Sequence, residues 1–429
     1  MKISFFTLGC KLNQAETDEL KKELQKMGFL AVPFKAKANI AVVRACAVTC
    51  GASRTTRETI RQAKRRGAYV IATGCLEHKN LPEIDFMAKN NEEVIKHLQT
   101  VILNGTKCSE ESLSAHQNDP TEILRFAQDD KTTEPIDRTR AFIKIQTGCN
   151  FNCAYCVIPS FRGRAESVPT KEIIKKIKQA EKEGYKEVIL TGVNVCQYRN
   201  DSHHPAPLLH KEGAINLAGL LKRILTETKI PRIRLGSLDP RLISDEFIKL
   251  FSNPRLLPHW HLSLQSGSDE ILKKMRRGYT AKQYQTIVKK IRAKNPLFSL
   301  TTDIIAGFPG ETAKDFKATC NFVKKINFTK IHVFPFSPRP GTDAAKMPGA
   351  AQDKIKTERV KKLIKIANST SREFIKKFIG LSRPVLFEHK KTALSGGYAP
   401  EYFTVKYKSS KNLQNKIVEV KLASSSILQ

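Results

Sequence analysis

Three closely spaced cysteines are the strongest chemical signal in the sequence. They lie in the run GCNFNCAYC as Cys149, Cys153 and Cys156, with three and then two residues between them. Three thiolates with no fourth cysteine or histidine in register can hold three irons of a [4Fe–4S] cube and leave the fourth iron open to a small ligand. A structural zinc ion is the alternative, but it takes four protein ligands. The run therefore favours a cluster with an open iron.

Three further cysteines lie far apart in the chain, and each stands just after an apolar run that predicts a β-strand. Cys10, Cys46 and Cys75 follow ISFFTL, NIAVVRA and AYVIATG. The carboxyl ends of parallel strands meet at one edge of a sheet, so we expect these thiols to converge as a second three-thiolate site. Buried free cysteines are the alternative, which explains one such position more easily than three. The other thiols are interpreted as ordinary: Cys50, Cys108, Cys196 and Cys320.

Glycine-bearing loops follow a second series of predicted strands. After the cysteine run come TGVN, GSLDP, QSGS, AGFPGE and SPRPGT, each suited to the close approach of a ligand to the backbone. In parallel α/β folds, ligands bind at the carboxyl ends of the strands. The strands are expected at 141–146, 187–191, 232–236, 261–264, 299–306 and 330–336. The candidate cofactor-binding residues are Tyr155, Gly192, Asn194, Ser237 and Gln265.

The elements that must position these residues indicate an α/β protein of several domains. Alternating strands and helices predict a flavodoxin-like parallel domain and then a partial (βα)6 barrel, and the short strands near the end predict a small all-β barrel. Helices are expected at 15–28, 53–67, 170–184, 312–326 and 353–380. The predicted divisions are 1–104, a polar linker at 105–138, the barrel at 139–352, a basic helix at 353–380 and the terminal domain at 381–429.

Composition points to a folded protein with a polyanionic partner. Lysine and arginine total 74 against 41 acidic residues, a net charge of +33, which a polyanionic partner such as nucleic acid and a generally lysine-rich composition explain equally well. Residues 383–429 interleave basic side chains with aromatic ones, a mixture suited to phosphate contact and base stacking, although at least half of the aromatics should form the domain's own core. No apolar run is long enough to span a membrane and no secretory signal is evident, so a cytoplasmic location is expected.

Several motifs together resemble the tRNA methylthiotransferase family of radical S-adenosylmethionine (SAM) enzymes. They are TLGCKLNQAE, CAVT, TGC, GCNFNCAYC, LQSGSDEILKKMRRGYT, TDIIAGFPGET and FSPRPGT, and they cover nearly the whole chain. The opening TLGCK is most similar to the branch that acts on N(6)-threonylcarbamoyladenosine. The terminal domain is similar to the family's TRAM domain, an RNA-binding barrel.

The resemblance implies two [4Fe–4S] clusters and two molecules of SAM. The 149–156 cysteines would hold the cluster whose open iron binds SAM, and reductive cleavage would yield a radical that takes a hydrogen from carbon 2 of the adenine. Cys10, Cys46 and Cys75 would hold the auxiliary cluster that supplies sulfur. The implied partners are the anticodon stem-loop of tRNA, with the modified base at position 37, and an electron donor such as flavodoxin or ferredoxin.

Two departures and three alternatives accompany the resemblance. Arg44-Ala45 stands where the family usually has Asn-Thr, and Cys196 where a glycine is common. The alternatives are methylthiolation of isopentenyladenosine in tRNA, methylthiolation of a ribosomal protein side chain, and a non-enzymatic RNA-binding protein with structural zinc. A histidine-bearing insert at 200–215 is interpreted as a surface loop; its histidines are His203, His204 and His210.

Overall fold

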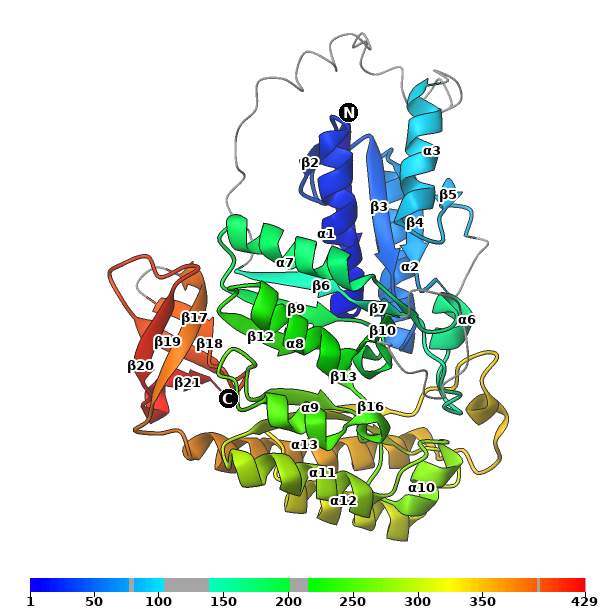
Figure 1. Ribbon diagram of the computed structural model, residues 1–429. Helices are drawn as coiled ribbons and strands as arrows, with labels where there is room; N and C mark the ends of the chain where they lie inside the picture. Colours follow the sequence, from blue (N-terminus) through cyan, green and yellow to red (C-terminus); the bar gives the residue numbers. More distant parts are fainter. Residues whose placement is uncertain (77–80, 104–138, 201–214, 392–393, 429) are drawn as a thin grey trace. The chain divides into compact units, whose positions relative to one another are not determined.

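The computed structural model describes residues 1–76, 81–103, 139–200, 215–391 and 394–428 (Figure 1). These residues form two compact units, 1–135 with 160–162 and 136–159 with 163–429. The predicted linker and the histidines of the 200–215 insert lie outside the described residues. Within the described part, no helix is long and apolar enough to cross a membrane.

The first unit is built on a five-stranded parallel sheet. Its strand order is β2-β1-β3-β4-β5, which is the flavodoxin-like order and confirms the predicted fold class. The strand bounds are β1 (Lys2–Thr7), β2 (Leu30–Val32), β3 (Ile40–Ala45), β4 (Tyr69–Gly74) and β5 (Phe86–Met87).

Helices cover both faces of this sheet. Helices α1 (Lys11–Lys26) and α3 (Asn91–Leu103) pack against the face that carries Ile40 and Val42, and α2 (Cys50–Arg65) packs against the face that carries Ala41 and Val43. Because β3 is buried on both faces, its sequence is continuously apolar up to Arg44 rather than alternating. Helix α1 begins four residues earlier than predicted, directly after Cys10.

The second unit contains a partial barrel of parallel strands. One sheet has the order β12-β9-β6 and the other the order β13-β14-β15-β16. Strand β14 lies two residues before the predicted 261–264, because Trp260 and Leu262 are the side chains that enter the core between strands and helices. The bounds are β6 (Arg140–Lys144), β9 (Glu187–Thr191), β12 (Arg232–Leu235), β13 (Ser237–Leu238), β14 (His259–Leu262), β15 (Ser299–Ala306) and β16 (Lys330–Pro335).

Amphipathic helices surround the barrel strands, as Figure 1 shows for the green to orange part of the chain. They are α7 (Thr170–Lys182), α8 (Leu217–Glu227), α9 (Asp245–Leu250), α10 (Asp269–Lys274), α11 (Ala281–Lys294), α12 (Ala313–Ile326) and α13 (Asp353–Lys376). Shorter elements in the connections are β7 (Gln146–Thr147), α6 (Ile158–Arg162), β8 (Glu166–Ser167), β10 (Arg199–Asn200) and β11 (Ile215–Asn216), with single 3-10 turns.

The terminal domain is an antiparallel sheet of order β20-β17-β18-β19-β21. The sequence predicts strands at 383–391, 401–408 and 416–422 in this domain but not β18, because LSGGY carries a glycine pair that normally disfavours strands. Gly397 is required there, since a Cβ at this position would lie 2.5 Å from the Leu386 carbonyl oxygen of the neighbouring strand. The bounds are β17 (Ser382–Lys391), β18 (Leu394–Tyr398), β19 (Thr404–Lys408), β20 (Ile417–Lys421) and β21 (Ile427–Leu428).

A buried charge network joins the terminal domain to the amino-terminal end of the barrel strands. Glu187, fully buried, is hydrogen-bonded to Arg234 at 2.8 Å and ion-paired with Arg232 at 2.9 Å. Arg140, in register beside Glu187, pairs with Glu388 of the terminal domain at 2.6 Å. Arg234 also donates to the Pro400 carbonyl at 3.0 Å.

Two aromatic residues of the terminal domain belong to this junction. The Tyr398 ring lies under the Arg140 guanidinium and the Tyr402 ring under that of Arg234, each with 4.4 Å between guanidinium carbon and ring centroid. Phe387 and Phe403 lie in the domain core. Of the five aromatic residues at 383–429, two lie in the domain core, where at least half of them were predicted, two lie against barrel arginines, and Tyr407 is exposed. Base stacking on RNA stays a prediction for this domain.

Candidate functional site

The first cysteine set lies in the loop between β7 and α6. The loop is fixed from two sides by backbone hydrogen bonds: the Ala154 N–H donates to the Met275 carbonyl at 3.1 Å, and the Ala344 N–H donates to the Ala154 carbonyl at 2.8 Å. Beneath it, Ala154 packs with Phe308 and Phe336, which come from the glycine-bearing loops after β15 and β16. Those loops therefore support the cysteines.

N–H donors point at the sulfurs of this set. The Phe151 backbone N–H donates to Cys149 Sγ at 3.5 Å, and Arg277 Nη1 donates to Cys153 Sγ at 3.3 Å. Burial raises the pKa of Cys149, and it raises that of Cys156 to about 12 although the backbone N–H of Ile158 opposes the shift. Thiols this buried become thiolates when a cation binds them, so donors and sulfurs together fit an iron–sulfur cluster.

The arrangement is not that of a single metal ion. Among the described residues, no group of three or more His, Cys, Asp or Glu side chains is placed to hold one ion. Each of the three cysteines of an open [4Fe–4S] cube binds a different iron, so the sulfurs need not converge on one point.

Unpartnered polar atoms mark the loop after β9. Gly192 is required there, since a Cβ would lie 2.8 Å from both the backbone and the side-chain oxygen of Gln146. The same Gln146 side chain accepts from the Asn194 N–H at 3.0 Å. Asn194 Oδ1 and Gln197 Nε2 are buried with no hydrogen-bond partner among the described residues. Such orphaned groups are rare in folded proteins, and they fit the binding of a polar cofactor.

The other candidate cofactor residues occupy separate strand ends. Ser237 begins β13, and Gln265 follows β14 with a φ of 72°, a left-handed conformation that is uncommon for residues other than glycine. Strained backbone of this kind concentrates at functional sites. The Tyr155 hydroxyl lies 3.5 Å from Arg277 Nη1. Their roles toward SAM remain predictions.

Sequence reasoning missed a buried pair next to the cysteines, Arg277 and Asp239. Arg277 is 5% exposed and Asp239 4% exposed, and Arg277 Nη2 lies 3.3 Å from Asp239 Oδ2. Both residues stood inside motifs noted in the sequence, GSLDP and KKMRRGYT, but neither was assigned a role. The only sequence signal for this pair was the Arg276-Arg277 dipeptide, which does not show which of the two arginines is buried.

In the first unit, the predicted second set lies at the carboxyl ends of β1, β3 and β4. A Cβ on Gly9 would lie 2.7 Å from Cys46 Sγ, so Gly9, at a φ of +92°, brings β1 against the Cys46 thiol. Burial raises the pKa of Cys46 and Cys75, and the charge of Cys10 also acts on both. This proximity fits a shared cluster, although its binding by Cys10, Cys46 and Cys75 remains a prediction.

Arg44, which stands near Cys46 where the family usually has asparagine, is directed away from solvent into a polar network. It is 2% exposed, donates to Glu16 Oε2 and Thr17 Oγ1 at 3.0 Å each, and bonds the Asn91 side chain. The arginine thus ties β3 to helices α1 and α3. Cys196 accepts from the Asp239 N–H at 3.4 Å and Cys320 is in the barrel core, in keeping with ordinary thiols.

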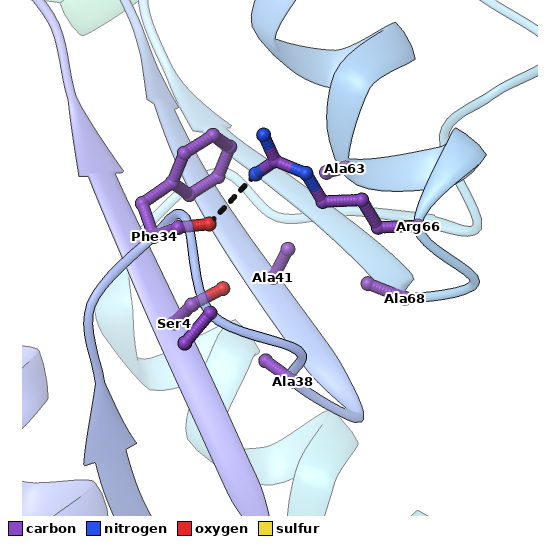
Figure 2. Close-up of a pocket in the computed structure, with 8 residues that line it drawn as sticks. Ser4, Phe34, Ala38, Ala41, Ala63, Arg66 and Ala68 are labelled. Atoms are coloured by element: carbon purple, nitrogen blue, oxygen red, sulfur yellow. Dashed lines mark hydrogen bonds between the residues drawn. The ribbon is translucent and has the colours of Figure 1, made fainter.

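A pocket elsewhere in the first unit is not part of these sites (Figure 2). It is lined by Ser4 and small apolar side chains near the amino-terminal ends of β1 and β3, at the opposite end of the strands from the cysteines. Its one charged side chain, Arg66, donates to the Phe34 carbonyl at 2.9 Å and lies over the Phe34 ring. The guanidinium is therefore already engaged.

Comparison with known proteins agrees with this architecture. Residues 143–323 match the model of the radical SAM superfamily, and residues 2–96 match that of the uncharacterized protein family UPF0004. A solved structure with a similar fold is the radical SAM methyltransferase TsrM from Kitasatospora setae, with a TM-score of 0.56 and 15% identity over 80% of this chain and 75% of that one. Fold and cysteine loop thus define a radical SAM protein, for which a [4Fe–4S] cluster and SAM are the cofactors.

Full-length relatives specify the family. The chain is 36% identical over 409 residues to the threonylcarbamoyladenosine tRNA methylthiotransferase MtaB of Aquifex aeolicus, covering 93% of this chain and 95% of the relative. It is 32% identical over 439 residues to the tRNA-2-methylthio-N(6)-dimethylallyladenosine synthase of Carboxydothermus hydrogenoformans, covering 97% and 95%. The chain therefore belongs to the radical SAM tRNA methylthiotransferase family, and the sequence-based identification is confirmed.

Proposed function

We propose that this enzyme methylthiolates carbon 2 of N(6)-threonylcarbamoyladenosine at position 37 of tRNA, next to the anticodon. The observation that carries the proposal is the pair of three-cysteine sets at the carboxyl ends of parallel strands, in a chain aligned over nearly its whole length with a threonylcarbamoyladenosine-type relative. The chemistry supplied by the bound cofactors is hydrogen abstraction from an unactivated C–H, which side-chain acids and bases cannot perform.

We assign the two sets different roles. Cys149, Cys153 and Cys156 would hold the cluster that binds SAM, with Gly192 and Asn194 toward the cofactor. Cys10, Cys46 and Cys75 would hold an auxiliary cluster that supplies sulfur. A low-potential protein such as flavodoxin or ferredoxin would deliver the electron, in the cytoplasm where tRNA is modified. The residues of the chain orient these groups and exclude water and oxygen.

The interior of the barrel supports a polar substituent on the adenine. His261 and Asp303 lie on the strand face opposite the Trp260 and Leu262 core, with 3.2 Å between Nε2 and Oδ2, and His332 pairs in register with Asp303. His261 also bonds Thr301 at 3.0 Å. A threonylcarbamoyl group carries a carboxylate, a hydroxyl and a urea, which such side chains can bind. An isopentenyl group offers no polar atom to these side chains, which would then bond only to one another.

Mass spectrometry of nucleosides tests the proposal. The gene is deleted and then restored as wild type or as Cys153→Ala, and tRNA from each strain is digested. We expect 2-methylthio-N(6)-threonylcarbamoyladenosine with the wild type only, and its unmodified precursor in the other strains. A methylthio group found instead on isopentenyladenosine, or on a ribosomal protein, would replace the proposal by the corresponding alternative.

A further inference from the structure

A buried arginine contacts the first cysteine set through its side chain. Arg277 uses Nη1 toward Cys153 Sγ at 3.3 Å, Nε toward the Tyr279 hydroxyl at 3.1 Å, and Nη2 toward Asp239 Oδ2 at 3.3 Å. It enters from the turn after α10, whose Met275 carbonyl also holds Ala154 of the cysteine loop. One short segment therefore fixes both the loop backbone and a charge at a cysteine sulfur.

The charges around this arginine do not balance among the described residues at the site. Asp239 is shared with Arg241, which donates to its two oxygens at 2.8 and 2.7 Å. Two guanidinium groups thus face one carboxylate. Burying a charge without a full partner is costly, and the missing negative charge lies in the direction of Cys153. Three thiolates around a [4Fe–4S]2+ core carry a net charge of −1, and −2 after the core gains one electron.

We propose that Arg277, oriented by Asp239, is a positioning residue that donates a charge-assisted N–H···S hydrogen bond to Cys153 and thereby raises the midpoint potential of the SAM-binding cluster. A donor at a cluster sulfur stabilises the more negative, reduced state, because the positive end of the bond faces the added electron. In this step one electron passes from a low-potential donor protein to the core, no bond breaks, and the guanidinium keeps its protons.

The adjacent arginine provides a matched control. Arg276 precedes Arg277 in the chain, but its side chain is 47% exposed and pairs with Asp343, which is 51% exposed. An exposed charge is screened by water and salt and acts only weakly on its surroundings. Replacing either arginine removes one unit of charge, but only the Arg277 variant removes a buried charge that is hydrogen-bonded to Cys153.

The test measures the potential of one cluster in the full-length chain. Cys10, Cys46 and Cys75 are replaced by alanine, so that the 149–156 set holds the remaining cluster. Reduction by titanium(III) citrate is followed anaerobically by electron paramagnetic resonance for the parent, Arg277→Gln, Arg277→Lys and Arg276→Gln. Iron content and Trp260 fluorescence report cluster loading and folding. We expect Arg277→Gln to lower the equilibrium constant for reduction about tenfold, a shift of about 59 mV for one electron.

The outcomes separate a redox role from a purely structural one. Arg276→Gln should leave the potential unchanged, and Arg277→Lys, which keeps the charge but not the planar fork, should shift it less than Arg277→Gln. If Arg277→Gln does not retain iron, Arg277→Lys decides: a lowered potential supports the proposal and an unchanged one overturns it. Equal shifts in Arg276→Gln and Arg277→Gln would also overturn it. The proposal rests on the cluster assigned under the proposed function but not on the substrate, so a failed nucleoside assay leaves this test intact.

Discussion

Replacing Glu187 by glutamine should destabilise the barrel and loosen the terminal domain. Glu187 is the carboxylate between Arg232 and Arg234, and the next strand adds Arg140. Burial alone would raise its pKa, but the two arginines outweigh this effect and lower the pKa from 4.5 to about 2. Glutamine keeps the shape and removes the charge, so it leaves the arginines buried without their shared partner.

The expected loss is about 3 kcal/mol in the free energy of unfolding at pH 7, from a pKa difference between 4.5 and about 2 at about 1.36 kcal/mol per unit. Breaking a buried ion pair costs about 3–5 kcal/mol in other proteins, which agrees. Because the folded-state pKa is the lower one, the stabilisation is fully present above pH 4.5 and is lost as the pH falls through 2. The difference in the free energy of unfolding between Glu187→Gln and the parent should therefore disappear as the pH falls over that range.

Urea unfolding followed by the fluorescence of Trp260, the single tryptophan, measures this loss within the barrel. The control is Glu246→Gln, because the Lys222–Glu246 pair has a similar distance of 2.6 Å but both side chains are more than half exposed. It should cost at most about 1 kcal/mol. A Glu187→Gln variant within 1 kcal/mol of the parent, or no more destabilised than Glu246→Gln, would refute the reasoning. Proteolysis should also cleave before the terminal domain faster in Glu187→Gln.

Three further predictions concern the clusters and the RNA surface. Alanine at all three of Cys149, Cys153 and Cys156 should abolish SAM cleavage but leave one cluster, as measured by iron analysis. Alanine at Cys10, Cys46 and Cys75 should instead stop product formation and preserve reductive SAM cleavage. Near-zero iron in the first variant would exclude a second cluster site. Gly9→Ala should lower the iron content of the second site, since the added Cβ would lie 2.7 Å from Cys46 Sγ. The control Gly67→Ala, at a similar positive φ but with open space around its Cβ, should retain the iron. Equal iron contents in the two variants would contradict this packing argument. Glutamine at four exposed lysines of the terminal domain should reduce the slope of log tRNA affinity against log salt concentration by up to about 0.9 per lost phosphate contact. Glutamine at four exposed lysines of α7 should leave this slope unchanged. An equal effect of both sets would show that the terminal domain is not the RNA-binding surface. The two sets are Lys408, Lys411, Lys416 and Lys421, and Lys171, Lys175, Lys178 and Lys182.

The sequence predicted the sheets and the places where cysteines follow strands, because period and composition are local properties. A buried parallel strand such as β3 is continuously apolar, and the residue that ends it is visible in the chain. Element boundaries were less accurate. Helix α1 begins at Lys11 although Cys10 makes no side-chain capping bond, so no capping residue marked its start.

What could not be predicted depends on partners distant in sequence. Arg277 and Cys153 are separated by 124 residues, and nothing in KKMRRGYT shows that its second arginine rather than its first is buried. The aromatic residues of 383–429 were divided in advance only into core and candidate stacking residues, and nothing in the local sequence shows that Tyr398 and Tyr402 lie against arginines of the barrel. Local patterns identify such side chains as available, and only the fold shows which contacts they already make.

The junction formed by Arg140, Glu187 and Arg234 sets a length scale for the enzyme. It fastens the terminal domain to the amino-terminal end of the barrel strands, while the cysteine loop lies beyond their carboxyl-terminal end. The nucleic acid that we predict to bind the terminal domain would therefore be anchored at the end of the barrel strands opposite to the cysteine loop. Selection of the modified nucleotide would then depend on its reach from that anchoring point, and tRNAs that differ in sequence but share a shape would be modified at the same position.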